Sequence, residues 1–274
     1  MTVDDTLSAR VEALIRTIAA REIMPRYRAL RDQDIAEKAP GDIVTVADHA
    51  VEAALAEALA SLLPEARFIG EERCALLPAL LDTLDDGLVW IVDPIDGTAN
   101  FAAGRAPFAV MVALLENGTT IASWIYDPLA DRMTTARQGR GTRRNGTGID
   151  TGLPADDARD WTGIVSRFAM PDEMAPAVAA LETRIGTVVP TMRCAGHEYV
   201  LVAEGSRDFA LYWRTLAWDH VPGALLLVEA GGVVERLDGT PYRPGSTATG
   251  LLLARDRRIA DHVRAVLRQP AGTG

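Results

Sequence analysis

The chain has 274 residues, of which 48% are hydrophobic and 24% are charged, a composition typical of globular proteins. Its formal charge of −10, from 28 basic and 38 acidic residues, argues against nucleic acid or an anionic membrane as the main partner. The two cysteines form no C-x-x-C motif, the N-terminal residues do not have the design of a signal peptide, and no apolar run reaches the ~18 residues of a membrane span. We therefore expect a cytoplasmic protein without a nucleic-acid or membrane partner.

The first half of the chain predicts helices followed by antiparallel strands. Asp4 or Asp5 can cap a first helix, and Asn117-Gly118 is a strong hairpin signal between two apolar runs. The other expected elements are a charged loop over residues 34–42, helices over 47–63 and 76–84, and strands at 67–69, 88–92, 107–115, 119–126 and 131–136.

The second half alternates strands and helices more regularly. Residues 138–160 are rich in Gly, Arg, Thr and Asp, which predicts a seam between halves of roughly 1–150 and 151–274. The expected elements after it are strands at 161–166, 187–191, 209–213, 233–236 and 251–254, and helices over 172–184, around 199–203, over 220–230 and to about 267. These patterns predict one compact α/β or α+β unit over residues 1–274.

The stretch from Trp90 to Phe101 carries the strongest chemical signal. A buried strand is expected to stop at Pro94, and two carboxylates, Asp93 and Asp96, lie three residues apart. Gly97 and the residue after it follow, where a helical turn would leave amides free. Oxygen ligands beside free amides suit a divalent cation and a phosphate together, although an ordinary Asp-Gly turn is an open alternative.

Further motifs accompany this stretch and change its interpretation. They are Gly70-Glu71-Glu72, Trp218-Asp219 with Gly223, Val44-Thr45-Val46-Ala47-Asp48, and Gly139-Arg140-Gly141 with Asn145-Gly146. In this order, and over residues 42–232, they resemble the signatures of the inositol monophosphatase family, the magnesium-dependent and lithium-sensitive phosphatases of small metabolites. The resemblance implies a layered α-β-α-β-α sandwich of the inositol monophosphatase and fructose-1,6-bisphosphatase type, usually a homodimer.

The resemblance also implies a set of metal ligands. Glu71, Asp93 and the Ile95 carbonyl would hold one ion, and Asp93 would bridge to a second ion completed by Asp96 and Asp219. Two or three Mg²⁺ ions are implied, with Mn²⁺ as a possible substitute, because carboxylate and carbonyl oxygens select these metals.

The same resemblance gives the catalytic roles. The Gly97 and Thr98 amides would hold the phosphate, while the Thr98 hydroxyl, Asp48 and Glu71 would orient or activate the attacking water. Taken alone, Asp48 could simply cap the second helix, and Asp219 could cap the helix that follows Trp218.

The walls around the alcohol half of the substrate differ from those of inositol-preferring members. Those members carry an acid seven positions before the W-D aspartate, where this chain has Tyr212, and small residues where it has His197 and Glu198. We expect His197, Glu198, Tyr212 and Arg214, or at least two of them, to lie near the alcohol end. An equally open alternative pairs Glu198 with Arg193 or Arg214.

Together these patterns predict metal-dependent hydrolysis of a small phosphomonoester, such as an inositol-like, sugar, polyol or amino-alcohol phosphate. Bisphosphate nucleotidase and histidinol-phosphate phosphatase relatives typically have T-K-x-F where this chain has T-A-N-F, which disfavours those two activities. The alternative of another class is a non-catalytic regulatory or binding protein on the same fold. A calcium-stabilised loop would need more ligands than Asp93 and Asp96 supply.

Overall fold

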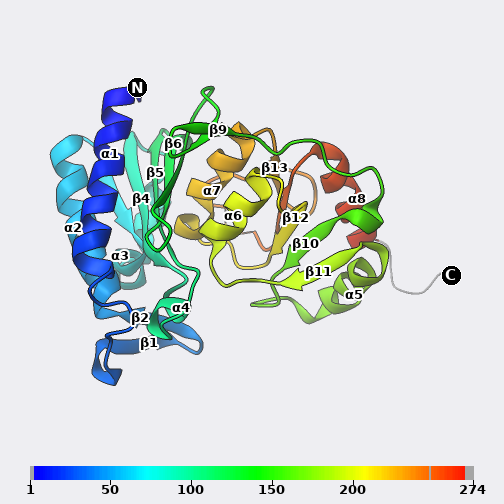
Figure 1. Cartoon of the computed structure of the whole chain (residues 1–274), viewed down its shortest axis with the longest axis horizontal. Helices are drawn as coiled ribbons and strands as arrows, with labels where there is room; N and C mark the ends of the chain where they lie inside the picture. The colour runs from blue at the N-terminus through cyan, green and yellow to red at the C-terminus, as the bar shows by residue number, and fades with distance from the viewer. Residues whose placement is uncertain (1–2, 247, 269–274) are drawn as a thin grey trace.

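A computed structural model describes residues 3–246 and 248–268 of the chain. Its helices and sheets form five layers in the order α-β-α-β-α, which run from left to right in Figure 1. The predicted layered sandwich is therefore confirmed. Each sheet buries apolar side chains on both faces, as a sheet covered by helices on both sides must.

The first outer layer consists of α1 (Asp5–Ile18) and α2 (Val46–Leu62). Asp4 caps α1, because its side chain accepts a hydrogen bond of 2.7 Å from the Leu7 amide. A π-helical turn, Ala19–Ile23, continues α1. The apolar faces of these helices pack against the first sheet and form one core with it.

The first sheet has seven strands in the order β3-β4-β5-β6-β7-β8-β9. Only the β3–β4 pair is parallel. Asn117 and Gly118 make the β5–β6 turn with φ values of 49° and 74°, as the sequence predicted. The strands are β3 (Arg67–Gly70), β4 (Leu88–Asp96), β5 (Ala109–Glu116), β6 (Thr119–Asp127), β7 (Arg132–Arg137), β8 (Thr142–Arg144) and β9 (Thr147–Ile149).

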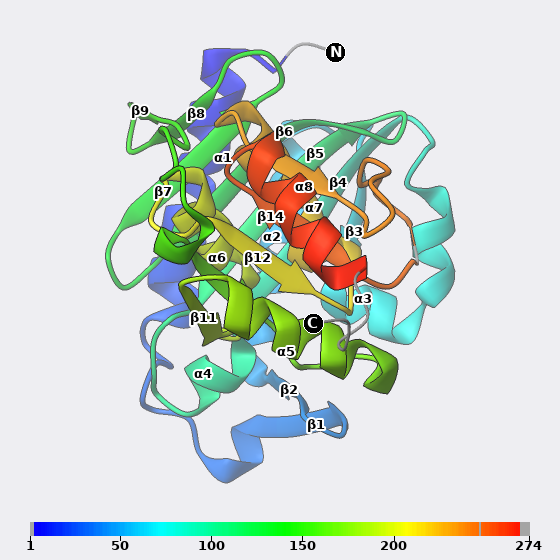
Figure 2. The same cartoon turned by 90° about the vertical axis from the view of Figure 1, so that its right-hand side faces the viewer.

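Two helices, α6 (Ala195–Ala203) and α7 (Ala217–Glu229), fill the space between the sheets. The second sheet has the order β11-β10-β12-β14-β13. Figure 2 shows its outer face covered by α5 (Ala175–Arg184) and α8 (Arg257–Arg268). Its strands are β10 (Thr162–Val165), β11 (Thr187–Pro190), β12 (Phe209–Tyr212), β13 (Val233–Glu235) and β14 (Leu251–Ala254).

Two local predictions are wrong. The expected charged loop at residues 34–42 is largely a hairpin of β1 (Ile35–Ala39) and β2 (Asp42–Thr45), which lies at one end of the molecule in Figure 2. A two-stranded ribbon buries little on either face, so its sequence lacks the alternating pattern of a strand. The expected helix over 76–84 is the end of α3 (Glu71–Leu76) followed by a 3₁₀ turn, Pro78–Thr83.

Residues 138–160, expected as a seam between halves, include β8 and β9, which extend the first sheet. Edge strands are short and charged, so composition hides them. The division near residue 150 as a boundary between halves stays a prediction. Within residues 3–246 and 248–268, we find no helix with both the length and the apolar character that a bilayer span needs.

Candidate active site

A cavity of ≈150 Å³ opens where the β1–β2 hairpin, the end of β4 and the N-terminal turns of α6 and α7 meet. Four acidic residues from three motifs line it, Glu71, Asp93, Asp96 and Asp219, and so does Asp42 of the hairpin. The fold thus brings together motif carboxylates that lie up to 148 positions apart in the sequence. Such a group can bind a hard cation.

Burial is the main cause that raises the pKa of Asp93 and of Asp219 well above the ordinary aspartate value, and the neighbouring Glu71 charge raises both further. One oxygen of Asp93, Oδ1, is buried without a hydrogen-bond partner in the described structure. A buried carboxylate oxygen without a partner is costly, and a bound cation would remove that cost. Asp93 Oδ1 is therefore an oxygen that a cation could contact.

The end of β4, which carries Asp93 and Asp96, differs from the sequence prediction. The strand does not stop at Pro94 but continues to Asp96, with a register shift between Asp93 and Asp96 that takes the proline out of the ladder. Gly97 then adopts a left-handed φ of 85° and opens the short helix α4 (Thr98–Ala102). A Cβ there would lie 3.0 Å from the Pro107 carbonyl oxygen, so both backbone shape and space require glycine.

Asp96 joins the first sheet to the middle helices. Its Oδ1 accepts a hydrogen bond from the Ala195 amide at 3.1 Å, and its Oδ2 accepts one from the Gly196 amide at 2.6 Å. The Cys194 thiol also donates to Oδ2 at 3.1 Å. Burial raises the pKa of Asp96 to about 6, because these hydrogen bonds offset only part of the desolvation. Asp96 is thus an acceptor for the first turn of α6 as well as a candidate ligand.

Asp48 links the start of α2 to the turn after β4. Its Oδ2 accepts hydrogen bonds from the Thr45 amide at 2.8 Å and from the Thr45 hydroxyl at 2.6 Å, which forms a capping box. Its Oδ1 lies 3.1 Å from the Thr98 hydroxyl, which also lies 2.8 Å from the Ile95 carbonyl oxygen. The capping role and the contact with Thr98 therefore coexist. Burial raises the pKa of Asp48 to about 7.

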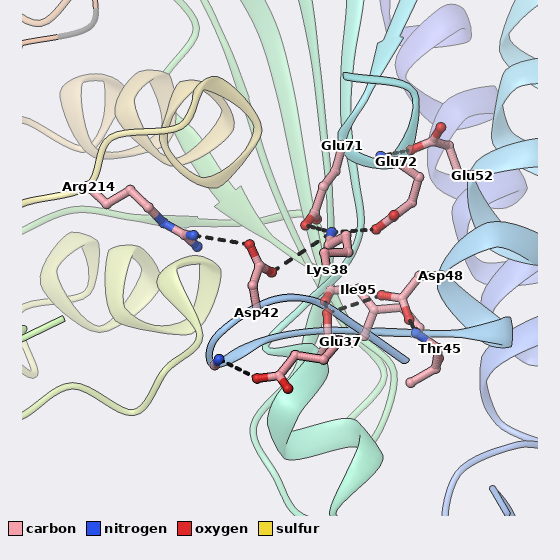
Figure 3. Close-up of polar contacts among 12 residues, drawn as sticks. Glu37, Lys38, Asp42, Thr45, Asp48, Glu52, Glu71, Glu72, Ile95 and Arg214 are labelled. Carbon is pink, nitrogen blue, oxygen red and sulfur yellow. Dashed lines mark hydrogen bonds and ion pairs between the residues drawn. The ribbon is translucent and has the colours of Figure 1, made fainter. Parts of the chain in front are cut away.

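Lys38, on β1, reaches the acidic wall from the hairpin. Figure 3 shows its ammonium between two carboxylates, 2.7 Å from Glu71 Oε1 and 3.0 Å from Glu72 Oε1. Glu52 of α2 holds the start of α3 by accepting the amides of Glu72 and Arg73 at 2.8 Å and 3.0 Å. Glu71 is therefore positioned from two sides, and any metal ion that binds it must compete with an internal ammonium.

No group of three or more Asp, Glu, His or Cys side chains in the described part of the chain is arranged so that it could hold a metal ion. The pairing of Glu71 with Lys38 is consistent with this finding, since that carboxylate is bound to a cation from the chain itself. The sequence analysis missed both Lys38 and Glu52. Glu52 had a usable signal, because it interrupts the buried face of α2 four positions after Asp48.

Comparison with known proteins decides the family. The sequence model of the inositol monophosphatase family matches residues 4–269. The chain belongs to this family. An inositol-1-monophosphatase of Mesorhizobium japonicum is 30% identical over 244 residues, which cover 85% of this chain and 86% of the relative.

Two further similar proteins carry the name SuhB. The Nus factor SuhB of Pasteurella multocida is 29% identical over 227 residues, or 81% of this chain and 82% of the relative. The crystal structure of the extragenic suppressor protein suhB from Bartonella henselae has a TM-score of 0.81 at 23% identity, covering 97% and 99% of the two chains. At that identity the structural likeness supports the fold alone.

Four residues were expected around the alcohol half of the substrate. Two of them, Tyr212 and Arg214, line the cavity. Glu198 lies behind this wall: it is fully buried and accepts hydrogen bonds from Tyr212, Thr191 and the Met192 amide. It forms an ion pair with neither of the arginines proposed as its partners. A pocket position for Glu198 is therefore wrong, and its carboxylate supports the wall instead.

His197 lies away from this cavity, so its expected position is also wrong. It lines a smaller cavity of ≈60 Å³ on another side of α6, with its Nε2 3.6 Å from Asp127 Oδ2. Successive helical residues point about 100° apart, and here His197 and its neighbour Glu198 point to different sides of α6. Burial lowers the pKa of His197.

His220 has a structural contact at the cavity wall. Its Nε2 lies 3.1 Å from the Arg214 carbonyl oxygen and its Nδ1 lies 3.2 Å from the Tyr199 hydroxyl. Because a carbonyl only accepts, Nε2 carries the proton and Nδ1 accepts from Tyr199. Burial lowers the pKa of His220 to about 4, so the ring is neutral at pH 7 and holds the backbone of Arg214 in place.

Proposed function

We propose that this protein is a magnesium-dependent phosphatase of a small phosphomonoester. The observation that carries the proposal is the acidic cavity, in which a buried Asp93 oxygen without a partner lies among carboxylates from three other motif positions. Membership of the inositol monophosphatase family supports it. A net charge of −10 also means that an anionic substrate needs a local cation to be held.

The proposed ligands are the carboxylates of Glu71, Asp93, Asp96 and Asp219 and the Ile95 carbonyl. When bound, two or three Mg²⁺ ions, or Mn²⁺ in their place, would neutralise phosphate oxygens, lower the pKa of a water and stabilise the leaving alkoxide. The ammonium of Lys38 contacts Glu71 Oε1, so a metal ion at this carboxylate would compete with it for that oxygen.

The chain's own groups would then orient the reactants. The Gly97 and Thr98 amides would bind the phosphate at the start of α4, where glycine's left-handed backbone exposes them. The Thr98 hydroxyl, between Asp48 and the Ile95 carbonyl, would position the attacking water together with Glu71. With a pKa of about 7, Asp48 could accept a proton from that hydroxyl near neutral pH.

The proposal is tested by phosphate release from a panel of phosphomonoesters with and without Mg²⁺. Asp93→Asn should lower turnover by several orders of magnitude, because it removes the proposed bridging charge. It should fold normally, since the loss of one buried negative charge relieves repulsion. Asp82→Asn, at an exposed aspartate outside the cavity, is the matched control and should keep wild-type activity. Near-normal activity of Asp93→Asn in saturating Mg²⁺ would remove Asp93 from the proposed role.

The remaining family properties are part of the same proposal. We expect inhibition by Li⁺ through competition at one magnesium position, a cytoplasmic location and a homodimer. Full activity at high Li⁺ would count against a family-like site, and the mass in solution, measured by light scattering, tests the dimer.

A second candidate function is a regulatory or binding role without turnover. The relative named Nus factor SuhB and the ion pair between Lys38 and Glu71 favour it. The two candidates differ in one measurement, because a binding protein would release no phosphate from any ester in the panel at any Mg²⁺ concentration.

A further inference from the structure

Two arginines line the cavity together with the acidic residues. Arg193 precedes α6 and Arg214 follows β12, and both line the cavity. Arg193 is exposed, and no ion pair joins it to an acid within residues 3–246 and 248–268. A cavity-lining arginine without a carboxylate partner has N–H donors available to a ligand.

The backbone around Arg193 is held in an unusual shape. Arg193 has a left-handed φ of 59°, which is uncommon for a residue with a side chain and costs free energy. Its amide donates to the Thr191 hydroxyl oxygen at 2.9 Å, and that hydroxyl donates to Glu198 at 2.6 Å. The Asn100 amide group holds the Met192 carbonyl at 2.9 Å. Contacts with Glu198 and Asn100 therefore hold the backbone of the loop that carries Arg193.

Neighbouring side chains also hold Arg214 in place. His220 donates to its carbonyl, and its guanidinium lies 4.8 Å from the ring centre of Phe168, which also lines the cavity. One side of the guanidinium contacts Asp42 at 3.3 Å, as Figure 3 shows, and 38% of the side chain is exposed. A guanidinium has five N–H donors, so this single contact leaves donors for a ligand.

Tyr212 lines the same cavity as the two arginines and Asp42. Tyr212, which replaces the acid of inositol-preferring members, is neutral and donates its hydroxyl proton to Glu198. Glu198 is fully buried, so its carboxylate offers nothing to the cavity. A neutral polyol would therefore meet two cationic side chains where those members present a carboxylate to its hydroxyls.

We propose that the alcohol half of the substrate carries a second anionic group, a carboxylate or a second phosphate, which Arg193 and Arg214 bind. This inference rests on the proposed phosphatase function and narrows its substrate class. The second anion would contact these arginines in the same cavity that holds the reacting phosphate. The planar fork of a guanidinium matches both carboxylate and phosphate, so this contact selects charge and geometry together.

The test compares pairs of esters that differ by one anionic group. Glycerol 1-phosphate against 3-phosphoglycerate tests a carboxylate, and fructose 1-phosphate against fructose 1,6-bisphosphate tests a second phosphate. In the wild type, kcat/KM should favour the more anionic member of at least one pair, which identifies the anion. Arg193→Gln should reduce that preference by about 10- to 100-fold, the range for loss of a charged hydrogen bond.

Arg10→Gln is the matched control, because Arg10 is an exposed arginine on the outer helix α1 and lies outside the cavity. It should leave the preference unchanged. If Arg193→Gln slows both members of each pair equally, Arg193 contacts the common phosphate and the inference is wrong. If wild type hydrolyses both members equally in Mg²⁺, the inference fails while the phosphatase function stands. If no ester is hydrolysed, the phosphatase function itself fails.

Discussion

The substitution Asp48→Asn should make the protein more stable and less active. The asparagine oxygen can accept both Thr45 hydrogen bonds, and its amide group can donate to the Thr98 hydroxyl oxygen, whose proton then goes to the Ile95 carbonyl. Asparagine thus reproduces the hydrogen bonds of a protonated Asp48. The substitution removes the cost of ionising a fully buried carboxyl without leaving a donor or acceptor unpaired.

The size of the effect follows from the pKa of Asp48, which burial raises from 3.8 to about 7. Because the unfolded chain loses this proton near pH 4 and the folded protein only near pH 7, the carboxyl destabilises the fold progressively as pH rises between these values. At about 1.4 kcal/mol per pKa unit, the full cost is on the order of 4 kcal/mol at pH 7 and above. The variant should match wild type near pH 4 and exceed it by up to this amount at pH 8.

Urea unfolding in the presence of a chelator, at several pH values from 4 to 8, measures this difference. Asp82→Asn, at an exposed aspartate, serves as the control and should show no trend with pH. Turnover of Asp48→Asn should fall, because an amide cannot accept a proton from Thr98. A stability difference that stays flat or falls with pH would refute the argument, and undiminished turnover would remove Asp48 from the proposed mechanism.

Two further substitutions test contacts that only the structure shows. Lys38→Met should raise the Mg²⁺ affinity by about tenfold, because the ammonium no longer competes for Glu71. Titration calorimetry measures this affinity, and unchanged or weaker binding would mean that Lys38 does not compete. Glu198→Ala should release the loop that carries Arg193 and reduce the preference for doubly anionic esters. Glu198→Gln can still accept hydrogen bonds from the loop and donate one to Tyr212, so it should retain that preference. Equal kcat/KM ratios in both Glu198 variants would show that the loop does not depend on this side chain.

The sequence by itself determined the elements whose signals are local. The cap at Asp4, the Asn117-Gly118 hairpin and most strands and helices follow from capping, turn chemistry and periodicity over a few residues. The motifs around Glu71, Asp93 and Asp219 also pointed to one family, and the family model confirms it. Such signals survive because each depends on residues close together in the chain.

Only the tertiary structure decided which side chains meet. Lys38 and Glu71 are 33 positions apart, and Asp96 reaches the Gly196 amide across 100 positions, so neither contact leaves a local pattern. The neighbours His197 and Glu198 were expected in one pocket, but a helix turns them to different sides of α6. Their direction is fixed by which face of α6 packs against the two sheets, and that packing depends on the whole core rather than on the six residues around them.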